Sequence, residues 1–313
     1  MNAEVVVVGE AMALMLASSG LPLKRAIRFE RGVAGAESNV AIGLARLGHR
    51  VAFAGRVGDD AAGDWVRNGL RGEGIDTSSL TTEATRPTGL MLRDWAGESR
   101  PIVVDYYRHG SAGSTIDPEQ LPREAIRQAS AVFVSGITAM LSPSAEAYVD
   151  AFFDAAADAG VPVYLDPNIR LRLAPIEDWQ RVIRPLIKRA STLLVGHDEL
   201  QLLELDPDGA CHLNETTSTV VIKSGSAGAH VVSRDGQFTQ PARTVRVVDT
   251  VGAGDAFTAG WISARLRGMD IRRTARVASI VASLAVAAPG DTAGLPTRTE
   301  LDTIAESGSE VDR

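Results

Sequence analysis

A glycine-rich turn in the last quarter of the chain carries the residues best suited to chemistry. It reads DTVGAGDAF over residues 249–257 and opens onto a helix expected at 254–266. Gly252, Ala253 and Gly254 let the backbone approach a ligand closely. The free N–H groups of a first helical turn, aided by the helix dipole, favour an anion. The turn therefore predicts an anion-binding site.

Asp255 stands within this first turn, beside the place of the predicted anion. A carboxylate repels a phosphate, so either Asp255 is an ordinary helix-start residue or it has a chemical role. A general base that takes a proton from an attacking hydroxyl, while backbone amides hold the transferred phosphoryl group, would account for it. We therefore expect phosphoryl transfer.

The sequence lacks the signature motifs of other nucleotide-dependent protein classes. The sequence has no G-x-x-x-x-G-K-[ST] motif and no kinase catalytic-loop or D-F-G signature, which argues against P-loop nucleotidases and protein kinases. Only Gly9 follows the first apolar run, so the glycine fingerprint of a Rossmann dehydrogenase is missing. The five histidines are scattered, without the spacing of a metal cluster.

Short apolar runs that alternate with helical segments must position the turn. The four valines at 5–8 are typical of a strand buried on both faces of a parallel sheet. Further strands are expected at 51–54, 131–134, 161–165, 192–195, 219–222, 229–232, 238–240 and 243–248, and helices at 40–47, 59–71, 144–159, 177–189, 254–266 and 271–288. This order predicts an α/β fold with a doubly wound, mainly parallel sheet flanked by helices.

Two segments interrupt the alternation. Residues 13–32 show no helical period, and residues 88–110 contain two extended runs, 89–95 and 102–107, joined by a turn. We expect them to pair into a small β-sheet lid beside a core of residues 1–12, 33–87 and 111–313. The alternative is a decorative edge hairpin. The polar residues 300–313 are expected to fray.

Composition limits the function classes. An apolar share of 45% in 313 residues excludes a long disordered chain, and a net charge of −7 disfavours nucleic-acid binding. The single cysteine, Cys211, excludes an intrachain disulfide and favours a reducing compartment. The uncharged, alanine-rich run at 277–290 is short for a membrane helix. We expect a cytoplasmic protein without nucleic-acid or membrane partners.

Two signatures in register resemble the ribokinase, or PfkB-type, family of carbohydrate kinases. Residues 249–257 resemble its C-terminal signature. Residues 34–48 resemble its N-terminal Gly-Gly-x-x-x-Asn signature, with Ala34 replacing the first glycine. The resemblance covers the whole chain. It implies a ribokinase-like doubly wound domain with a small β-lid, and transfer of the ATP γ-phosphoryl group to a sugar hydroxyl.

The resemblance also implies roles for single residues. Asp255 matches the catalytic base, and Gly252, Ala253 and Gly254 match the anion hole. A nucleotide-site loop is matched by residues 223–228, with Lys223 and Ser224 at its start and Gly225 and Gly228 at its glycine positions.

Cation sites are implied less completely. Glu199 matches the glutamate of an Asn-x-x-Glu motif linked to magnesium, although Gly196 replaces the asparagine. Mg²⁺ is required by the chemistry, because it neutralises phosphate charge. Asp249 and the loop 288–294 could line a site for a monovalent cation such as K⁺.

Two arginine-containing segments bear on the substrate. Tyr106 and Arg108 close the expected lid, and Asn168 and Arg170 follow an expected strand at its carboxyl end. Arginine is the preferred partner of a carboxylate because its donors form a planar fork. Both segments resemble 2-keto-3-deoxygluconate kinases, as do the substrate-side residues Gly35 and Asn39 of the N-terminal signature and the run 294–298. The alternative for both arginines is an ordinary surface role, since the chain has 29 of them (32 basic residues less three lysines).

Two departures bear on this assignment. Met91 replaces a lid tyrosine of that subgroup, which puts one substrate hydrogen bond in doubt. Ala13 replaces an aspartate common in kinases of neutral sugars, which favours a sugar acid. The resulting hypothesis is a 2-dehydro-3-deoxygluconokinase that phosphorylates the terminal hydroxyl with ATP. A kinase of fructose or ribose and a non-catalytic sugar-acid sensor are the alternatives. Pairing of exposed lid edges would give a homo-oligomer.

Overall fold

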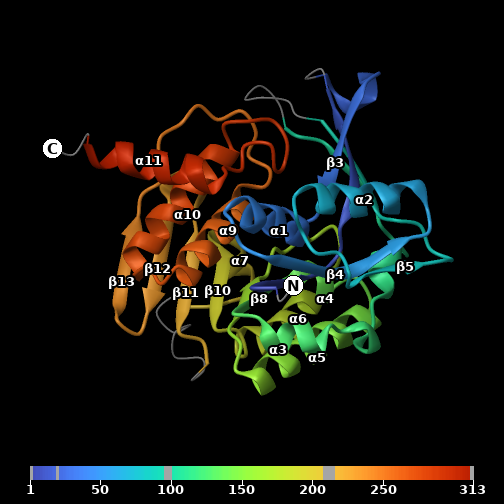
Figure 1. Cartoon of the computed structure of the whole chain (residues 1–313), viewed down its shortest axis with the longest axis horizontal. Helices are drawn as coiled ribbons and strands as arrows, with labels where there is room; N and C mark the ends of the chain where they lie inside the picture. Colours follow the sequence, from blue (N-terminus) through green and yellow to red (C-terminus); the bar gives the residue numbers. More distant parts are fainter. Residues whose placement is uncertain (1–2, 19–20, 95–100, 207–215, 311–313) are drawn as a thin grey trace.

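The computed structural model describes residues 3–18, 21–94, 101–206 and 216–310. Nine strands in these ranges form the main sheet: β1 (Val5–Val8), β4 (Val51–Gly58), β5 (Leu80–Glu83), β8 (Ala131–Ser135), β9 (Val163–Asp166), β10 (Thr192–Gly196), β11 (Thr219–Lys223), β12 (Ala229–Ser233) and β13 (Gly236–Gln240). Their order is β13-β12-β11-β10-β9-β8-β1-β4-β5 (Figure 1). All neighbours pair in parallel except β11–β12 and β12–β13, which confirms the mainly parallel sheet.

Helices cover both faces of this sheet. They are α1 (Ala36–Arg46), α2 (Ala61–Gly72), α3 (Arg123–Gln128), α4 (Gly136–Ala139), α5 (Pro143–Ala159), α6 (Ile176–Ile187), α7 (His197–Leu202), α9 (Ala253–Leu266), α10 (Ile271–Ala285) and α11 (Arg298–Glu310). Because side chains alternate along a strand, Val5 and Val7 belong to one core cluster with α1, α9 and α10. Val6 and Val8 belong to a second cluster with α5 and α6. The run of four valines thus serves both cores.

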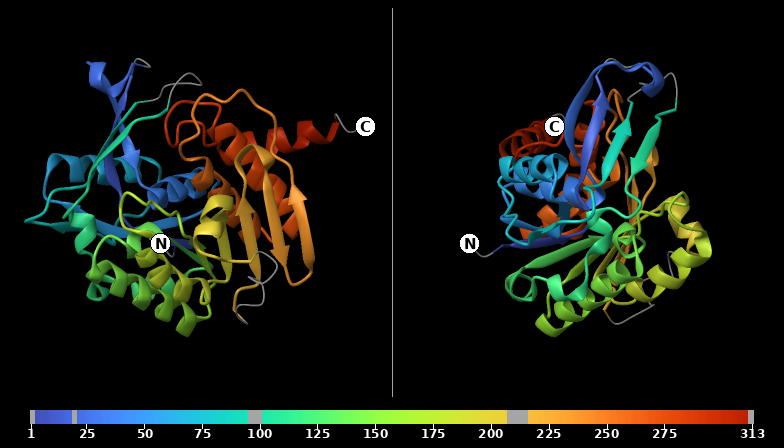
Figure 2. Two further views of the ribbon diagram at one scale, coloured as in Figure 1. Left: turned by 180° about the vertical axis from the view of Figure 1, so that it is seen from behind. Right: turned by 90° about the vertical axis from the view of Figure 1, so that its right-hand side faces the viewer.

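A second, four-stranded sheet stands beside the main one. It consists of β2 (Met12–Ala17), β3 (Phe29–Ala34), β6 (Leu90–Arg93) and β7 (Val104–Tyr107) in the order β3-β2-β6-β7. The parallel pairing of β2 with β6 joins the two predicted insertions into one sheet, as expected. Figure 2 shows this sheet projecting from the body of the molecule. We call it the lid sheet, although its action as a lid stays a prediction.

Some expectations were wrong or incomplete. Residues 243–248 form no strand, and they run instead along a cavity described below. Residues 298–310 form α11 rather than a frayed tail. Neither β5 nor α7 was expected. The turn at 96–98 and Cys211 lie outside the described residues.

Among the described residues, no helix combines the length and apolar character that a membrane crossing requires.

Candidate active site

The glycine turn lies at the edge of the main sheet where its parallel strands end. Gly252 precedes α9 with φ +80°, a left-handed conformation that favours glycine. A Cβ atom at this position would lie 2.5 Å from the carbonyl oxygen of Asp291. The first N–H groups of α9 have no carbonyl partner within the helix, and that of Ala253 makes only a long hydrogen bond, 3.4 Å, to the Thr250 carbonyl. The turn thus offers donors to an anion. The anion hole itself stays a prediction.

The carboxylate of Asp255 lies in the first turn of α9 and is fixed by a neighbouring helix. Asn39 in α1 donates a hydrogen bond from Nδ2 to Oδ2 of Asp255 at 2.8 Å. Burial raises the pKa of Asp255 to about 7, with a further contribution from the negative charge of Asp166. The amide of Asn39 and the charges of Lys223 and Arg170 act in the opposite direction. A carboxylate that titrates near neutral pH suits proton abstraction.

The ammonium group of Lys223, at the end of β11, lies beside this turn. It forms an ion pair with Oδ2 of Asp166 at the end of β9. A Cβ atom added to Gly254 would lie 3.5 Å from the Lys223 Nζ atom. Burial alone would lower the pKa of Lys223, but the charges of Asp166 and Glu199 raise it above its usual value. A fixed positive charge thus lies next to the N–H groups of the turn.

A cavity of about 590 Å³ opens on one side of the turn. Its walls come from the loop after β11, the irregular segment 242–247, α9 and α10, and they include Lys223, Gly225, Gly228, Ala242, Arg243, Thr244, Val245, Val247, Thr250, Ala253, Gly254, Phe257, Ser279, Ala282, Ser283 and Val286. Ser224 is adjacent and donates its N–H to the Gly228 carbonyl at 2.8 Å. Most residues predicted to bind a nucleotide therefore lie around this cavity, and Gly252 lines the neighbouring one.

A smaller cavity, of about 80 Å³, lies on the other side of the turn, under the lid sheet. Its lining includes every residue predicted to contact the substrate: Gly35, Asn39, Tyr106, Arg108, Asn168, Arg170 and Asp255. They come from β7, α1, α9 and three connecting segments, which are far apart in the sequence. Gly252 and Asp255 line the smaller cavity, whereas Ala253 and Gly254 line the larger one. The turn thus forms the boundary between the two.

The two arginines of the smaller cavity have different partners. Arg108 donates from Nε to Oε2 of Glu10 at 2.8 Å and forms an ion pair with the same carboxylate through Nη2. Its guanidinium carbon lies 5.9 Å from the ring centre of Tyr106. Arg170 donates from Nη1 to the Ile169 carbonyl at 2.9 Å and forms no ion pair within the described residues. Its charge is therefore available to an anionic ligand.

Comparison with known proteins identifies the family. The family model "pfkB family carbohydrate kinase" matches residues 2–298. The chain belongs to the PfkB family of carbohydrate kinases. Two relatives named 2-dehydro-3-deoxygluconokinase are similar along most of their length. The Bacillus subtilis relative is 37% identical over 96% of this chain and 95% of its own, and that of Thermoproteus tenax 33% over 95% and 92%.

Solved structures agree with this membership. A PfkB protein from Polaromonas is 33% identical, with a TM-score of 0.85 over 96% of this chain and 99% of its own. A putative ribokinase from E. coli, solved with ATP and Mg²⁺, has a TM-score of 0.89 over 97% and 99% at 22% identity. This second likeness shows the ribokinase-like fold.

The predicted magnesium residue of this kinase has a structural task of its own. Oε1 of Glu199 accepts the N–H of Ile169 at 2.6 Å, and Oε2 accepts that of Gly196 at 2.8 Å. No three acidic, histidine or cysteine residues of the described chain are grouped to hold a metal ion. Oδ1 of Asp166, however, is buried without a hydrogen-bond partner. One or two carboxylates completed by phosphate and water suffice for Mg²⁺, so Asp166 and Glu199 fit the ion.

A buried arginine occupies the region of the predicted monovalent-cation site. Nη2 of Arg93, at the end of β6, lies 2.8 Å from Asp249 Oδ2 and 2.8 Å from Asp291 Oδ1. Burial raises the pKa of Asp291, and the charge of Arg93 opposes this shift. The carboxylate of Asp249 is thus already paired with a cation.

Three residues at the site were not predicted: Glu10, Arg93 and Asp166. Asp166 and Glu10 both follow strands at the carboxyl edge of the sheet, which is the signal that indicates them. Arg93 lies in a lid strand, and no local pattern distinguishes it from other arginines of this kinase.

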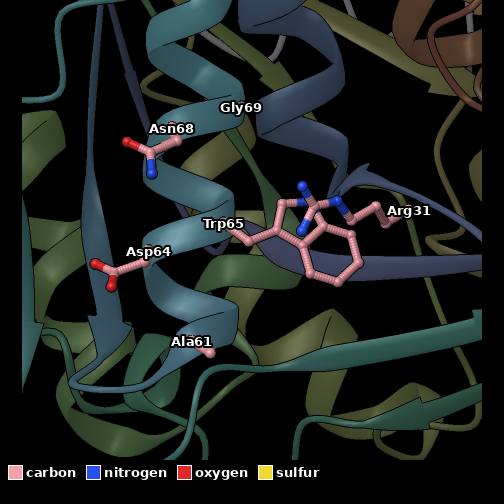
Figure 3. A pocket seen from close by; sticks show the side chains of 6 residues that line it. All are labelled: Arg31, Ala61, Asp64, Trp65, Asn68 and Gly69. Atoms are coloured by element: carbon pink, nitrogen blue, oxygen red, sulfur yellow. The ribbon is translucent and has the colours of Figure 1, made fainter.

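A further hollow, of about 480 Å³, lies outside this site (Figure 3). It is formed by Arg31 of the lid sheet and by Ala61, Asp64, Trp65, Asn68 and Gly69 of α2. The Arg31 guanidinium carbon lies 5.5 Å from the Trp65 ring centre, a cation–π contact that attaches the lid sheet to the core.

Proposed function

We propose that this kinase transfers the γ-phosphoryl group of ATP to the terminal hydroxyl of 2-dehydro-3-deoxygluconate. One observation carries the proposal. Asp255 and Arg170 line the same small cavity, and Arg170 forms no ion pair within the described chain. The carboxylate of a sugar acid would give Arg170 a direct ion-pair partner, which a neutral sugar cannot supply. The names of the relatives that are 37% and 33% identical support the same substrate.

The chemistry follows from the two cavities. The nucleotide would occupy the larger one, with its γ-phosphate at the N–H groups of Gly252, Ala253 and Gly254 and near the Lys223 ammonium. The sugar would occupy the smaller one, with its terminal hydroxyl at Asp255. Asp255 accepts the hydroxyl proton as the sugar oxygen bonds to phosphorus, and the bond from phosphorus to the ADP oxygen breaks.

The positive charges have separate tasks in this proposal. The N–H groups and Lys223 stabilise charge on the phosphoryl oxygens. Mg²⁺, when bound, would neutralise part of the phosphate charge, and Asp166 and Glu199 would hold it. Arg170 binds the substrate carboxylate. Arg108, already paired with Glu10, contributes mainly by fixing the end of the lid strand near the substrate.

A substrate panel tests the proposal. Purified protein with ATP and Mg²⁺ is assayed for ADP release with 2-dehydro-3-deoxygluconate, 2-dehydro-3-deoxygalactonate, 5-dehydro-2-deoxygluconate, fructose and ribose. The second and third acids are the substrates named for relatives that are 28% and 27% identical. We expect the highest kcat/KM with 2-dehydro-3-deoxygluconate. A higher value with fructose or ribose would overturn the assignment, and binding of the acid without turnover would favour a sensor.

A further inference from the structure

Arg93 connects the lid sheet to the anion-binding turn from beneath. It is the last residue of β6, and its side chain is fully buried. Nη2 lies 2.8 Å from a carboxylate oxygen of Asp249 and 2.8 Å from one of Asp291, whose side chains are 0% and 4% exposed. One guanidinium group is thus shared by two buried carboxylates.

These carboxylates shape the turn that carries the N–H groups. Oδ1 of Asp249 accepts the N–H of Val251 at 3.1 Å, and Oδ2 accepts the N–H of Gly290 at 3.0 Å. The backbone of Asp291 packs against Gly252 so closely that a Cβ atom there would meet its carbonyl oxygen at 2.5 Å. Moving either carboxylate would therefore move the segment 250–252.

A cation is needed at this place on electrostatic grounds. Two buried carboxylates repel each other, and their negative charge opposes the binding of a phosphoryl group at the adjacent N–H groups. A positive charge between them removes both penalties. In this chain an arginine side chain supplies it, and an arginine carries its charge at every physiological pH.

We propose that Arg93 is a built-in monovalent cation of this kinase, so that phosphoryl transfer requires no K⁺ or similar ion. Arg93 acts as a positioning residue, since its hydrogen bond and ion pairs go to Asp249 and Asp291, although it also lines the wall of the smaller cavity. The inference rests on the kinase activity of the family and not on the choice of sugar.

The first test uses the unmodified protein. ADP release, with whichever sugar of the panel is phosphorylated, is measured in chloride salts of K⁺, Na⁺ and tetramethylammonium at one ionic strength. The melting temperature is measured in the same salts without substrate. We expect rates equal within about twofold and equal melting temperatures. Activation by K⁺ of about tenfold or more over tetramethylammonium would overturn the proposal, as would a melting temperature raised only by K⁺.

The second test removes the guanidinium group. Arg93→Ala is expected to lose about tenfold or more of kcat, because small displacements of positioned groups are costly. K⁺ or free guanidinium should restore part of the rate and raise the melting temperature of this variant alone. Arg93→Lys, which keeps a positive charge, should need neither ion. Unchanged kcat in Arg93→Ala, or a loss that no cation restores, would contradict the proposal.

Arg31→Ala is the matched control. Arg31 also belongs to the lid sheet and also contacts the core, but its partner is the Trp65 ring and not a carboxylate (Figure 3). Loosening the lid through this variant should create no cation dependence. If Arg31→Ala acquires the same K⁺ dependence, the effect comes from lid mobility and the proposal is wrong. If Arg93→Ala does not fold, the wild-type salt series and Arg93→Lys decide.

Discussion

The hydrogen bond from Asn39 to Asp255 should set the acidic limb of the activity profile. The Asn39 amide stabilises the carboxylate, while burial and Asp166 stabilise the protonated form, and the pKa of Asp255 stands at about 7. Only the carboxylate can accept the sugar proton, so kcat/KM should fall as pH drops through that value. Between pH 8 and pH 6 the ionised fraction falls about tenfold.

Asn39→Leu removes the hydrogen bond at nearly constant side-chain volume. A hydrogen bond to a charged group is worth about 1.5–3 kcal/mol, and one pKa unit corresponds to about 1.4 kcal/mol. The pKa of Asp255 should therefore rise by about one to two units, and the acidic limb should move to higher pH by the same amount. At pH 7.5 the variant would lose roughly tenfold in activity, and most of this loss would be regained near pH 9.5.

The assay separates this effect from lost substrate contact. ADP is quantified by chromatography after quenching, which avoids coupling enzymes, and kcat/KM for the sugar is measured from pH 5.5 to 9.5. A lost contact lowers kcat/KM equally at every pH, whereas a raised pKa moves the limb. Ser38→Ala is the control, because the Ser38 hydroxyl bonds to the Gly35 carbonyl on the same helical turn. An unmoved limb in Asn39→Leu would refute the reasoning.

Four further outcomes follow from the site, from three variants. Folding raises the pKa of Asp255 from 3.8 to about 7, so the free energy of unfolding falls as pH rises between these values. In urea unfolding, Asp255→Asn should be more stable than the wild type by roughly 2–4 kcal/mol at pH 8. At pH 4 it should be no more stable than the wild type. The same variant should lose turnover by about 10²-fold or more in the ADP assay while sugar affinity by calorimetry changes little. Arg170→Leu should raise KM for the sugar acid by about tenfold or more and leave KM for ATP unchanged; an equal rise in KM for a neutral sugar would make its role structural. Gly252→Ala should reduce kcat by about tenfold or more without loss of the sugar site, because the added Cβ meets the Asp291 carbonyl at 2.5 Å; normal kcat would show that the turn tolerates displacement.

The sequence predicted most of the fold because its signals are local. Four valines in a row indicate a strand buried on both faces, and a glycine before a helix indicates the turn at 252. The strand predicted at 243–248 was wrong. Alternating apolar residues there are typical of a strand, but the segment lines a cavity and pairs with no other strand. The short strand β5, half exposed at the sheet edge, gave no comparable apolar run.

The sequence indicated part of the candidate site but none of its ion pairs. The resemblance to PfkB-type kinases indicated Asp255, Asn39, Arg108 and Arg170, and these four residues line one cavity. Which arginine is neutralised depends on residues far along the chain: Glu10 is 98 residues from Arg108, and Asp249 is 156 residues from Arg93. Such pairs are fixed by tertiary packing, and no periodicity or local spacing encodes them.

These pairings decide how an acidic protein can bind two anions. The number of arginines does not show which of them can bind an anionic ligand. A guanidinium group that already forms an ion pair with a carboxylate offers little net charge to a ligand. Arg93 forms ion pairs with two buried carboxylates next to the turn, and Arg108 forms one with Glu10. In the proposed function Arg170 is therefore the arginine left to bind the sugar, and Lys223 is the cation beside the phosphate, although Asp166 offsets part of its charge. If the enzyme selects sugar acids through the charge of Arg170, Arg170→Leu should abolish the preference for acids over neutral sugars. Arg108→Leu should lower kcat/KM for both classes of sugar alike.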